Sequence, residues 1–258
     1  MNSRLLAFER IENFRDYGGY VTPQGPLAMG RLYRSGLHAR ATDHDLEEMT
    51  GLDIASIVDL RRLSERIAQP SRRPVGWAGQ VIESDLGGDG EAPHIAFLKT
   101  QPLTAASARN YMGNAYAHMA YEPNHVALFK GHFQALAEGR GPVLIHCAAG
   151  KDRTGLLAAL THTLLGVNND DLMQDYLATN QAINLEGRID VMVQRLHKVT
   201  GRTAAPEAVV AFLGVEPDFL QSAWRAIDAQ SGSRQAYLEQ VLGIDAAMAG
   251  AIRDNLMA

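Results

Sequence analysis

The sequence predicts an α/β protein with a central, mostly parallel sheet flanked by helices. Short runs rich in β-branched and other apolar residues, at about 54–60, 78–83 and 142–146, alternate with segments of helical spacing. Such alternation is typical of parallel sheets, because each connection between parallel strands carries a helix back across the sheet. With 258 residues, of which 46% are hydrophobic, the chain can bury a full core as one large domain.

The first third of the chain is predicted to alternate turns with short strands. Glycine-rich turn signals separate strand-like pieces throughout residues 13–35. A short helix is then expected over 42–50, because Thr42 fits the N-cap position and Asp45 gives a weak capping box. Gly51 ends this helix, and a buried strand follows it.

The middle and the end of the chain are predicted to be mainly helical. Between Pro93 and Gly139 the apolar residues fall at helical spacing, with a break at Pro123. Further predicted helices cover 170–180, 182–199, 206–212, 217–229, 233–241 and 245–256. This last region contains no catalytic motif and no repeat. We therefore expect it to pack against the sheet or against another subunit, and the sequence leaves the oligomeric state open.

The most informative stretch is residues 142–155, which read PVLIHCAAGKDRTG. An apolar strand leads into Cys147, five residues separate Cys147 from Arg153, and the helix-like run LLAALTHTLL follows. A tight loop of successive backbone N–H groups that ends at a helix N-terminus can surround a phosphate dianion. The stretch therefore predicts a phosphate-binding site with a nucleophile at its floor. The plainer interpretation, a buried thiol and a helix-capping arginine, explains the residues singly but not their arrangement.

The residue types of the loop suit contact with phosphate. The small side chains of Ala148, Ala149 and Gly150 let the backbone approach closely, and glycine tolerates a positive φ. Arg153 can hold two phosphate oxygens at once with its planar guanidinium, which a lysine cannot do. Lys151 adds a second cation that favours substrates with more than one phosphate group, or else is a solvated loop lysine.

Cys147 is the expected nucleophile, because a thiolate can attack phosphorus and later leave as an anion. The helix N-terminus and neighbouring cations favour that thiolate form. Thr154 is expected to donate its hydroxyl to the sulfur, and His146 to order the loop by hydrogen bonding rather than act as a base. Asp152 would repel a bound dianion at short range. We therefore expect it to turn away and orient Arg153 or cap a backbone amide, with an in-loop general acid as the alternative.

An alkyl phosphate also requires a general acid, because its leaving group departs poorly without a proton. Asp85 is the candidate, since it lies in the polar, glycine-rich segment 81–88 after a strand-like stretch. Glu83 and Asp89 compete for the same role. The alternative for Asp85 is an ordinary exposed turn residue.

The signature H-C-x2-G-K-D-R-T-G resembles that of the cysteine-dependent protein tyrosine phosphatase superfamily. Within it, the chain is similar to the atypical bacterial tyrosine/serine protein phosphatase family, and the resemblance covers nearly the whole sequence. The segments that carry it are NFRDYGG at 13–19, GRLYRS at 30–35, IVDLR at 57–61 with Glu65, and APH at 92–94 with Ala96 and Phe97. The Trp-Pro-Asp loop of eukaryotic tyrosine phosphatases is absent.

The resemblance implies a phosphatase that forms a phosphocysteine intermediate on Cys147 and binds phosphate through Arg153. The implied substrates are phosphotyrosine proteins or peptides, with phosphoserine, phosphothreonine or phosphoinositides accepted by some members. Asp85 falls where the family has a candidate acid, and Lys151 matches a lysine of lipid-directed members. Free phosphate and vanadate are expected to inhibit by occupying the same loop.

The resemblance also implies a tyrosine-phosphatase-like fold in which residues 1–258 form a single phosphatase domain. About 91–122 would be a lid-like helical insertion over the active site, and about 181–258 a helical C-terminal extension. A lid of this kind restricts access to the site and shields the thiolate from oxidants.

Composition and charge argue against several other classes. The net charge of −5 and a pI near 6.0 argue against nucleic acid as the main partner. No apolar run reaches the ~20 residues of a transmembrane helix. The N-terminal apolar stretch is too short for a secretory signal, so a cytoplasmic location is expected, although leaderless export leaves no mark in a sequence. The single cysteine precludes an intramolecular disulfide, and the nine histidines show no HExxH spacing. No metal and no other cofactor is expected.

Two other function classes share features of the signature. A rhodanese-like sulfurtransferase also places a cysteine in a loop beside a helix, but resemblance to that class implies a different spacing between cysteine and arginine. A catalytically inactive phosphate-binding module would keep the loop and lose the cysteine or the arginine. Because Cys147 and Arg153 are both present, an active phosphatase is the favoured interpretation.

Overall fold

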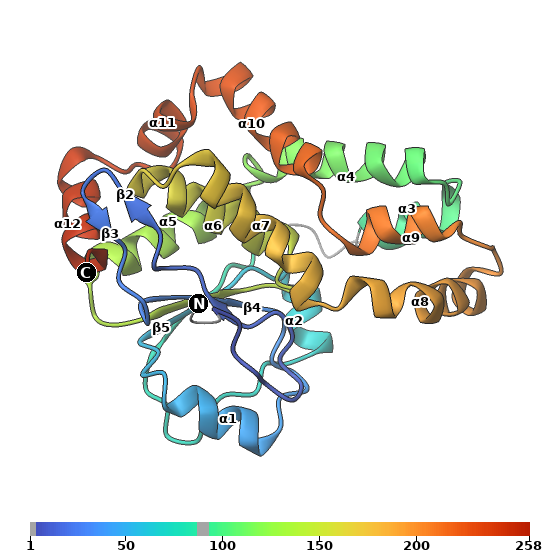
Figure 1. Ribbon diagram of the computed structural model, residues 1–258, viewed down its shortest axis with the longest axis horizontal. Helices are drawn as coiled ribbons and strands as arrows, with labels where there is room; N and C mark the ends of the chain where they lie inside the picture. The colour runs from blue at the N-terminus through green and yellow to red at the C-terminus, as the bar shows by residue number, and fades with distance from the viewer. Residues whose placement is uncertain (1–3, 87–92) are drawn as a thin grey trace.

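The computed structural model describes residues 4–86 and 93–258. A five-stranded sheet lies between layers of helices, and a helical lobe extends to one side (Figure 1). The strands are β1 (Arg15–Asp16), β2 (Val21–Thr22), β3 (Gly25–Pro26), β4 (Leu32–Ser35), β5 (Ser56–Asp59), β6 (Gln80–Ile82) and β7 (Val143–His146). The helices are α1 (Asp43–Thr50), α2 (Leu63–Ala68), α3 (Pro93–Thr100), α4 (Ala105–Met119), α5 (Pro123–Glu138), α6 (Asp152–Leu165), α7 (Asn169–Ala182), α8 (Leu185–Thr200), α9 (Pro206–Leu213), α10 (Pro217–Ser231), α11 (Arg234–Ala236), the π-helix η1 (Tyr237–Val241) and α12 (Ala246–Leu256).

The sheet has the order β1-β4-β7-β5-β6, and the pairs β4–β7, β7–β5 and β5–β6 are parallel. Only the pair β1–β4 in this sheet, among the residues described, is antiparallel. The predicted α/β class with a mostly parallel sheet is therefore confirmed. Strand β7 lies at the centre, so the residue that follows its carboxyl end lies where ligands bind in open α/β sheets.

Side chains of successive strand residues point to opposite faces, and this alternation divides the core into two layers. On β7, Val143 and Ile145 pack on the face covered by α5 and α6, whereas Leu144 packs on the opposite face with α1. On β5, Val58 and Ile57 divide in the same way. Both faces of the central strands are thus buried, as expected of a parallel sheet.

Several predicted elements are present with small shifts in their ends. The capping box of α1 is formed, since the Thr42 hydroxyl accepts from Asp45 N at 3.1 Å and the Asp45 carboxylate accepts from Thr42 N at 3.0 Å. The helix predicted over 233–241 is instead a short turn, α11, followed by the π-helix η1. Helix α2 is an element that the spacing of apolar residues did not predict.

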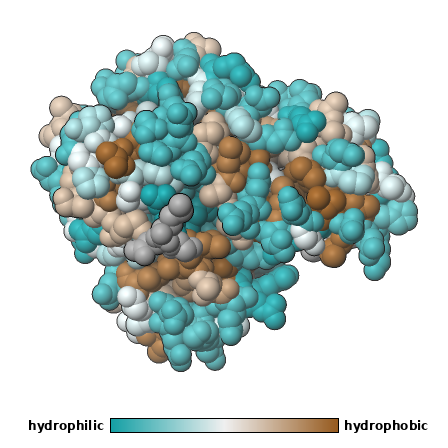
Figure 2. All heavy atoms as spheres, in the orientation of Figure 1, coloured by the Kyte–Doolittle hydropathy of each residue, from teal (hydrophilic) through white to brown (hydrophobic). Residues whose placement is uncertain are grey.

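The lobe consists of α3, α4, α8 and α9, and α10 packs beside α4 (Figure 1). Phe97 of α3, Leu103 and Val209 of α9 form a small core of its own. The surface of this lobe carries a hydrophobic area on the face shown in Figure 2. Within the described ranges, no helix is long and apolar enough to cross a membrane.

Candidate active site

Cys147 directly follows the central strand, at the edge where three parallel strands end together. Strand pairing places His146 of β7 beside Ser35 of β4 on one side and Asp59 of β5 on the other. Cys147 is buried at this edge, with 2% of its surface exposed. The loop of residues 148–151 then leads into α6, which begins at Asp152. The predicted order of strand, cysteine, loop and helix N-terminus is therefore present in the structure.

Gly150 shows why the loop needs a glycine. Its φ is +67°, in the left-handed region that favours glycine. A Cβ at this position would lie 2.4 Å from the carbonyl carbon and oxygen of Ser35, so no other residue fits without moving the neighbouring strand end. The loop is held against β4 from the other side as well, because Leu37 N donates to Ala148 O at 3.1 Å.

Arg153 is oriented by a carboxylate that the sequence patterns did not assign. Its Nη1 and Nη2 donate to Glu65 of α2 at 2.6 and 2.9 Å, and Nη1 also donates to Leu60 O at 3.2 Å. This fork fixes the plane of the guanidinium while 18% of the side chain remains exposed. Burial opposes the charge, but the hydrogen bonds that Arg153 donates to Glu65 and the nearby Cys147 and Asp152 outweigh it and raise the pKa of Arg153.

Thr154, in the first turn of α6, and His146, at the end of β7, are both fully buried. The Thr154 hydroxyl has no hydrogen-bond partner among residues 4–86 and 93–258, so it is available as the expected donor to sulfur. His146 stacks on His38 with ring centroids 4.3 Å apart, and its Nε2 lies 3.5 Å from the Asp59 carboxylate. Burial lowers the pKa of His146, and the nearby Asp59 carboxylate opposes this shift. These contacts order the strand end through packing more than through hydrogen bonds.

Asp59 beside the site belongs to a buried ion pair. Arg61 donates to both Asp59 oxygens, from Nε at 2.9 Å and from Nη2 at 2.7 Å, and its Nη1 donates to Gln69 O at 2.6 Å. Burial opposes ionisation of Asp59, but His146 and Arg61 hold its pKa at about 2. The pair therefore stays charged at neutral pH and fixes the backbone that leads from β5 toward α2.

Lys151 is buried and hydrogen-bonded, unlike a solvated loop lysine. Its Nζ donates to Phe212 O at 2.6 Å and to Gly214 O at 3.2 Å. These carbonyls lie at the C-terminus of α9, where the helix dipole favours a cation. In this conformation Lys151 joins the loop that follows Cys147 to the helical lobe.

Asp152 takes a partner different from those expected for it. Its Oδ1 accepts from the Tyr116 hydroxyl of α4 at 3.0 Å, and Tyr116 in turn accepts from the Tyr176 hydroxyl at 2.8 Å. Burial raises the pKa of both tyrosines well above the ordinary value, which keeps them protonated as donors. Asp152 is therefore held by a chain of hydroxyl groups, while Glu65 is the residue that orients Arg153.

Asp85 lies on the solvent side of Arg66. The Arg66 guanidinium, from α2, forms ion pairs with Asp85 and, at 3.4 Å, with Glu83, and the Asp85 side chain is 69% exposed. The competing candidate Asp89 lies outside the described residues. To act as an acid, Asp85 must leave this ion pair and take up a proton.

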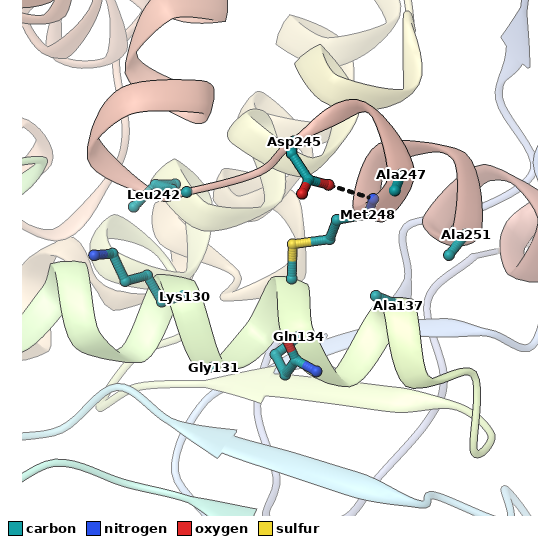
Figure 3. Close-up of a pocket in the computed structure, with 10 residues that line it drawn as sticks. Lys130, Gly131, Gln134, Ala137, Leu242, Asp245, Ala247, Met248 and Ala251 are labelled. Atoms are coloured by element: carbon teal, nitrogen blue, oxygen red, sulfur yellow. Dashed lines mark hydrogen bonds between the residues drawn. The ribbon is translucent and has the colours of Figure 1, made fainter.

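A groove of about 780 Å³ lies elsewhere, between α5 and α12 (Figure 3). Its lining includes Lys130 and Gln134 from α5 and Met248 from α12, which extends toward α5. Asp245 at its edge accepts from Met248 N at 2.8 Å and so serves as the N-cap of α12. No residue of the phosphate loop lines this groove, and it supplies no chemistry to the site.

Known proteins resemble this chain over nearly its whole length. The model of a family described as the tyrosine phosphatase family matches residues 6–258. A Cupriavidus necator protein named as a candidate tyrosine-protein phosphatase is 34% identical over 94% of this chain and 85% of its own length. The triple specificity protein phosphatase PtpB of Mycobacterium tuberculosis is 31% identical over 95% of this chain and 96% of its own length.

Among solved structures, TpbA of P. aeruginosa matches 71% of this chain and 86% of its own, at 18% identity and a TM-score of 0.33. The family is shown by the match to the family model over residues 6–258 and by the two relatives above 30% identity. The chain belongs to the tyrosine phosphatase family.

Proposed function

We propose that this protein is a phosphatase that hydrolyses phosphotyrosine through a phosphocysteine intermediate on Cys147. The observation that carries the proposal is the placement of Cys147 at the carboxyl end of β7, with Arg153 oriented in the first turn of α6. Phosphate bound in the loop would receive backbone N–H groups from one side and the Arg153 guanidinium from another. The nucleophile would lie below the phosphorus.

The proposed reaction has two steps. The Cys147 thiolate attacks phosphorus, an S–P bond forms, and the O–P bond to the substrate breaks while an acid gives a proton to the departing oxygen. Water then attacks phosphorus, passes a proton to a carboxylate, and releases inorganic phosphate and the thiolate. Arg153 stays hydrogen-bonded to the phosphoryl oxygens in both steps, and the Thr154 hydroxyl is suited to donate a hydrogen bond to the departing sulfur.

The substrate range is proposed to extend beyond phosphotyrosine to phosphoserine and phosphothreonine. The M. tuberculosis relative is named a triple specificity phosphatase, which supports a broad range by analogy. Phosphoinositides are the second candidate class, for which Lys151 would bind an additional phosphate group. Lys151 would first have to leave the carbonyls of Phe212 and Gly214, so the described conformation favours the protein substrates.

A substrate panel tests the proposed function. Phosphotyrosine peptide, phosphoserine peptide and phosphoinositide vesicles are compared at equal phosphate concentration, with release of inorganic phosphate as the readout. We expect turnover to be fastest on the phosphotyrosine peptide. Thiocyanate formation from thiosulfate and cyanide is measured in parallel. Sulfur transfer without phosphate release from any substrate would contradict the proposal.

Asp85 is proposed as the general acid, and Asp85→Asn tests this role. We expect hydrolysis of phosphoserine peptide to slow by about a hundredfold, because an alkoxide leaving group needs the proton, and aryl phosphates to slow far less. Glu83→Gln is the matched control, because it removes the other carboxylate that pairs with Arg66. Equal slowing of alkyl and aryl substrates would remove Asp85 from this role.

We also propose that the helical region at about 91–122 works as a lid together with part of the C-terminal extension. Helices α3 and α4, which lie within that region as far as it is described, share the small core of the lobe with α8 and α9. Lys151 connects the phosphate loop to the end of α9. Because α4 also packs on α10 and contributes Met112, Tyr116 and Met119 to the main core, opening would move α3, α8 and α9 and not the whole of α4.

A further inference from the structure

A buried polar cluster lies against the carbonyl oxygens of the phosphate loop. It consists of Asn13, Arg15, Arg34 and Asp175, whose exposed fractions are 2%, 2%, 0% and 3%. The first three residues belong to the N-terminal segments NFRDYGG and GRLYRS. These segments take no part in the reaction described above. Asp175 comes from α7, far away in the sequence.

Two members of the cluster hold carbonyl oxygens of the loop. Asn13 Nδ2 donates to Ala149 O at 3.2 Å and to Gly150 O at 2.8 Å. Arg34 Nη2 donates to Gly150 O at 3.0 Å. Together with the hydrogen bond from Leu37 N to Ala148 O, these contacts fix three successive carbonyl groups on the outer side of the loop.

The direction of these carbonyls determines the direction of the amides. In a planar trans peptide, C=O and N–H point in opposite directions. Carbonyls of residues 148–150 held on the outside therefore turn the N–H groups of residues 149–151 toward the phosphate site. A donor on a carbonyl also polarises its peptide group and strengthens the N–H of that group as a donor.

The cluster is itself held in place by one carboxylate. Asp175 accepts from Arg15 Nε at 3.1 Å and from Arg34 Nη1 at 2.6 Å, and Arg15 also donates to the Asn13 side chain. Asn13 has a φ of +58°, a left-handed conformation that asparagine adopts more readily than most residues. The asparagine side chain thus reaches the loop from a backbone conformation that suits its type.

The charges of the cluster favour an anion in front of it. Two guanidinium groups share one carboxylate, which leaves a net positive charge behind the loop. Burial and repulsion by Arg34 lower the pKa of Arg15 to about 10, so Arg15 stays protonated at neutral pH. Burial opposes ionisation of Asp175, but Arg15 and Arg34 outweigh it and lower the pKa of Asp175.

We infer that Asn13 and Arg34, held by Arg15 and Asp175, are positioning residues of the phosphate loop that turn its N–H groups toward phosphate and the Cys147 thiolate. This inference rests on the proposed function, since it assigns the arrangement of the same site. Among the described residues, the hydrogen bonds between the cluster and the loop all end on loop carbonyl oxygens, so the effect of the cluster is on the direction and strength of the amide donors.

Asn13→Gly tests the inference. Glycine accepts the positive φ and removes the two donors to the loop without changing charge. We expect the pH midpoint of Cys147 alkylation by iodoacetamide to rise by about one pH unit, and kcat for para-nitrophenyl phosphate to fall about tenfold. Thr179→Val is the matched control, because it also removes a hydrogen-bond acceptor of Arg15, at 3.2 Å, but has no contact with the loop carbonyls.

The comparison of the two variants separates positioning from stability. Both variants are expected to lower the melting temperature, whereas only Asn13→Gly is expected to shift the alkylation midpoint. An unchanged midpoint in folded Asn13→Gly, or an equal shift in Thr179→Val, would overturn the inference. If Asn13→Gly does not fold, Asn13→Ser gives the same test, since serine cannot reach both carbonyls. If the wild-type enzyme hydrolyses phosphate esters, the proposed function holds whichever result the two variants give.

Discussion

Cys147→Ser is expected to reduce hydrolysis of para-nitrophenyl phosphate by at least about a thousandfold, because a serine hydroxyl is not ionised at neutral pH and leaves phosphorus poorly. The thiol is buried at the end of β7, and serine is nearly the same size, so the fold should be retained. The readouts are the rate of phosphate release and the melting temperature of the variant.

The same variant should still bind the anion. The loop amides and Arg153 remain in place, so vanadate or a phosphotyrosine peptide is expected to bind the inactive protein and raise its melting temperature. Binding without turnover would separate the role of the sulfur from that of the loop. Activity within about tenfold of wild type in Cys147→Ser would show that another group is the nucleophile.

Arg153→Lys is expected to lower kcat/KM by about a hundredfold or more, because an ammonium cannot hold two phosphoryl oxygens in one plane. The substitution keeps the positive charge, so the loss reports geometry rather than charge alone. Initial rates with para-nitrophenyl phosphate at several concentrations separate the change in kcat from the change in KM.

Glu65→Gln is the matched control for Arg153. Glutamine keeps the length and one acceptor oxygen of Glu65 but loses the fork of 2.6 and 2.9 Å contacts that fixes the guanidinium. We expect a loss of about tenfold, smaller than that of Arg153→Lys, since the arginine itself remains. A larger loss in Glu65→Gln than in Arg153→Lys would contradict the assignment of Glu65 as the orienting residue.

The sequence was sufficient to place Cys147 at a strand end and to find the central strands, because those features are local. A run of apolar and β-branched residues marks β5 and β7, and Cys147, Gly150 and Arg153 all fall within seven consecutive residues. The capping box of α1 is equally local, because Thr42 and Asp45 lie three residues apart.

The partners of the site depend on contacts between distant segments, which residue patterns do not show. Glu65 lies 88 positions from Arg153, and Asn13 lies 137 positions from Gly150. Neither residue stands out in the sequence, because its contact with the loop forms only when the sheet folds. The segments that contain both residues carried the resemblance to the family, but nothing in their spacing indicated which atoms they would contact.

The C-terminal half shows a second limit of sequence patterns. Helix lengths there were predicted within a few residues, but the π-helix η1 has the same apolar residues as an α-helix and differs only in its hydrogen bonds. Lys151 is a further case. The sequence suggested either a second cation for phosphate groups or a solvated loop lysine, whereas the C-terminus of α9 provides carbonyl partners that bury it.

The alkylation of Cys147 by iodoacetate tests the central claim most directly, since this is the only cysteine of the chain. If the amides of the loop and Arg153 stabilise the thiolate, wild-type protein is alkylated rapidly at pH 6, and vanadate or phosphate protects it. The proposed enzyme requires both results. Slow alkylation at pH 6 that speeds up only toward pH 8–9, as for a free thiol of pKa about 8.5, with no protection by vanadate, would contradict it.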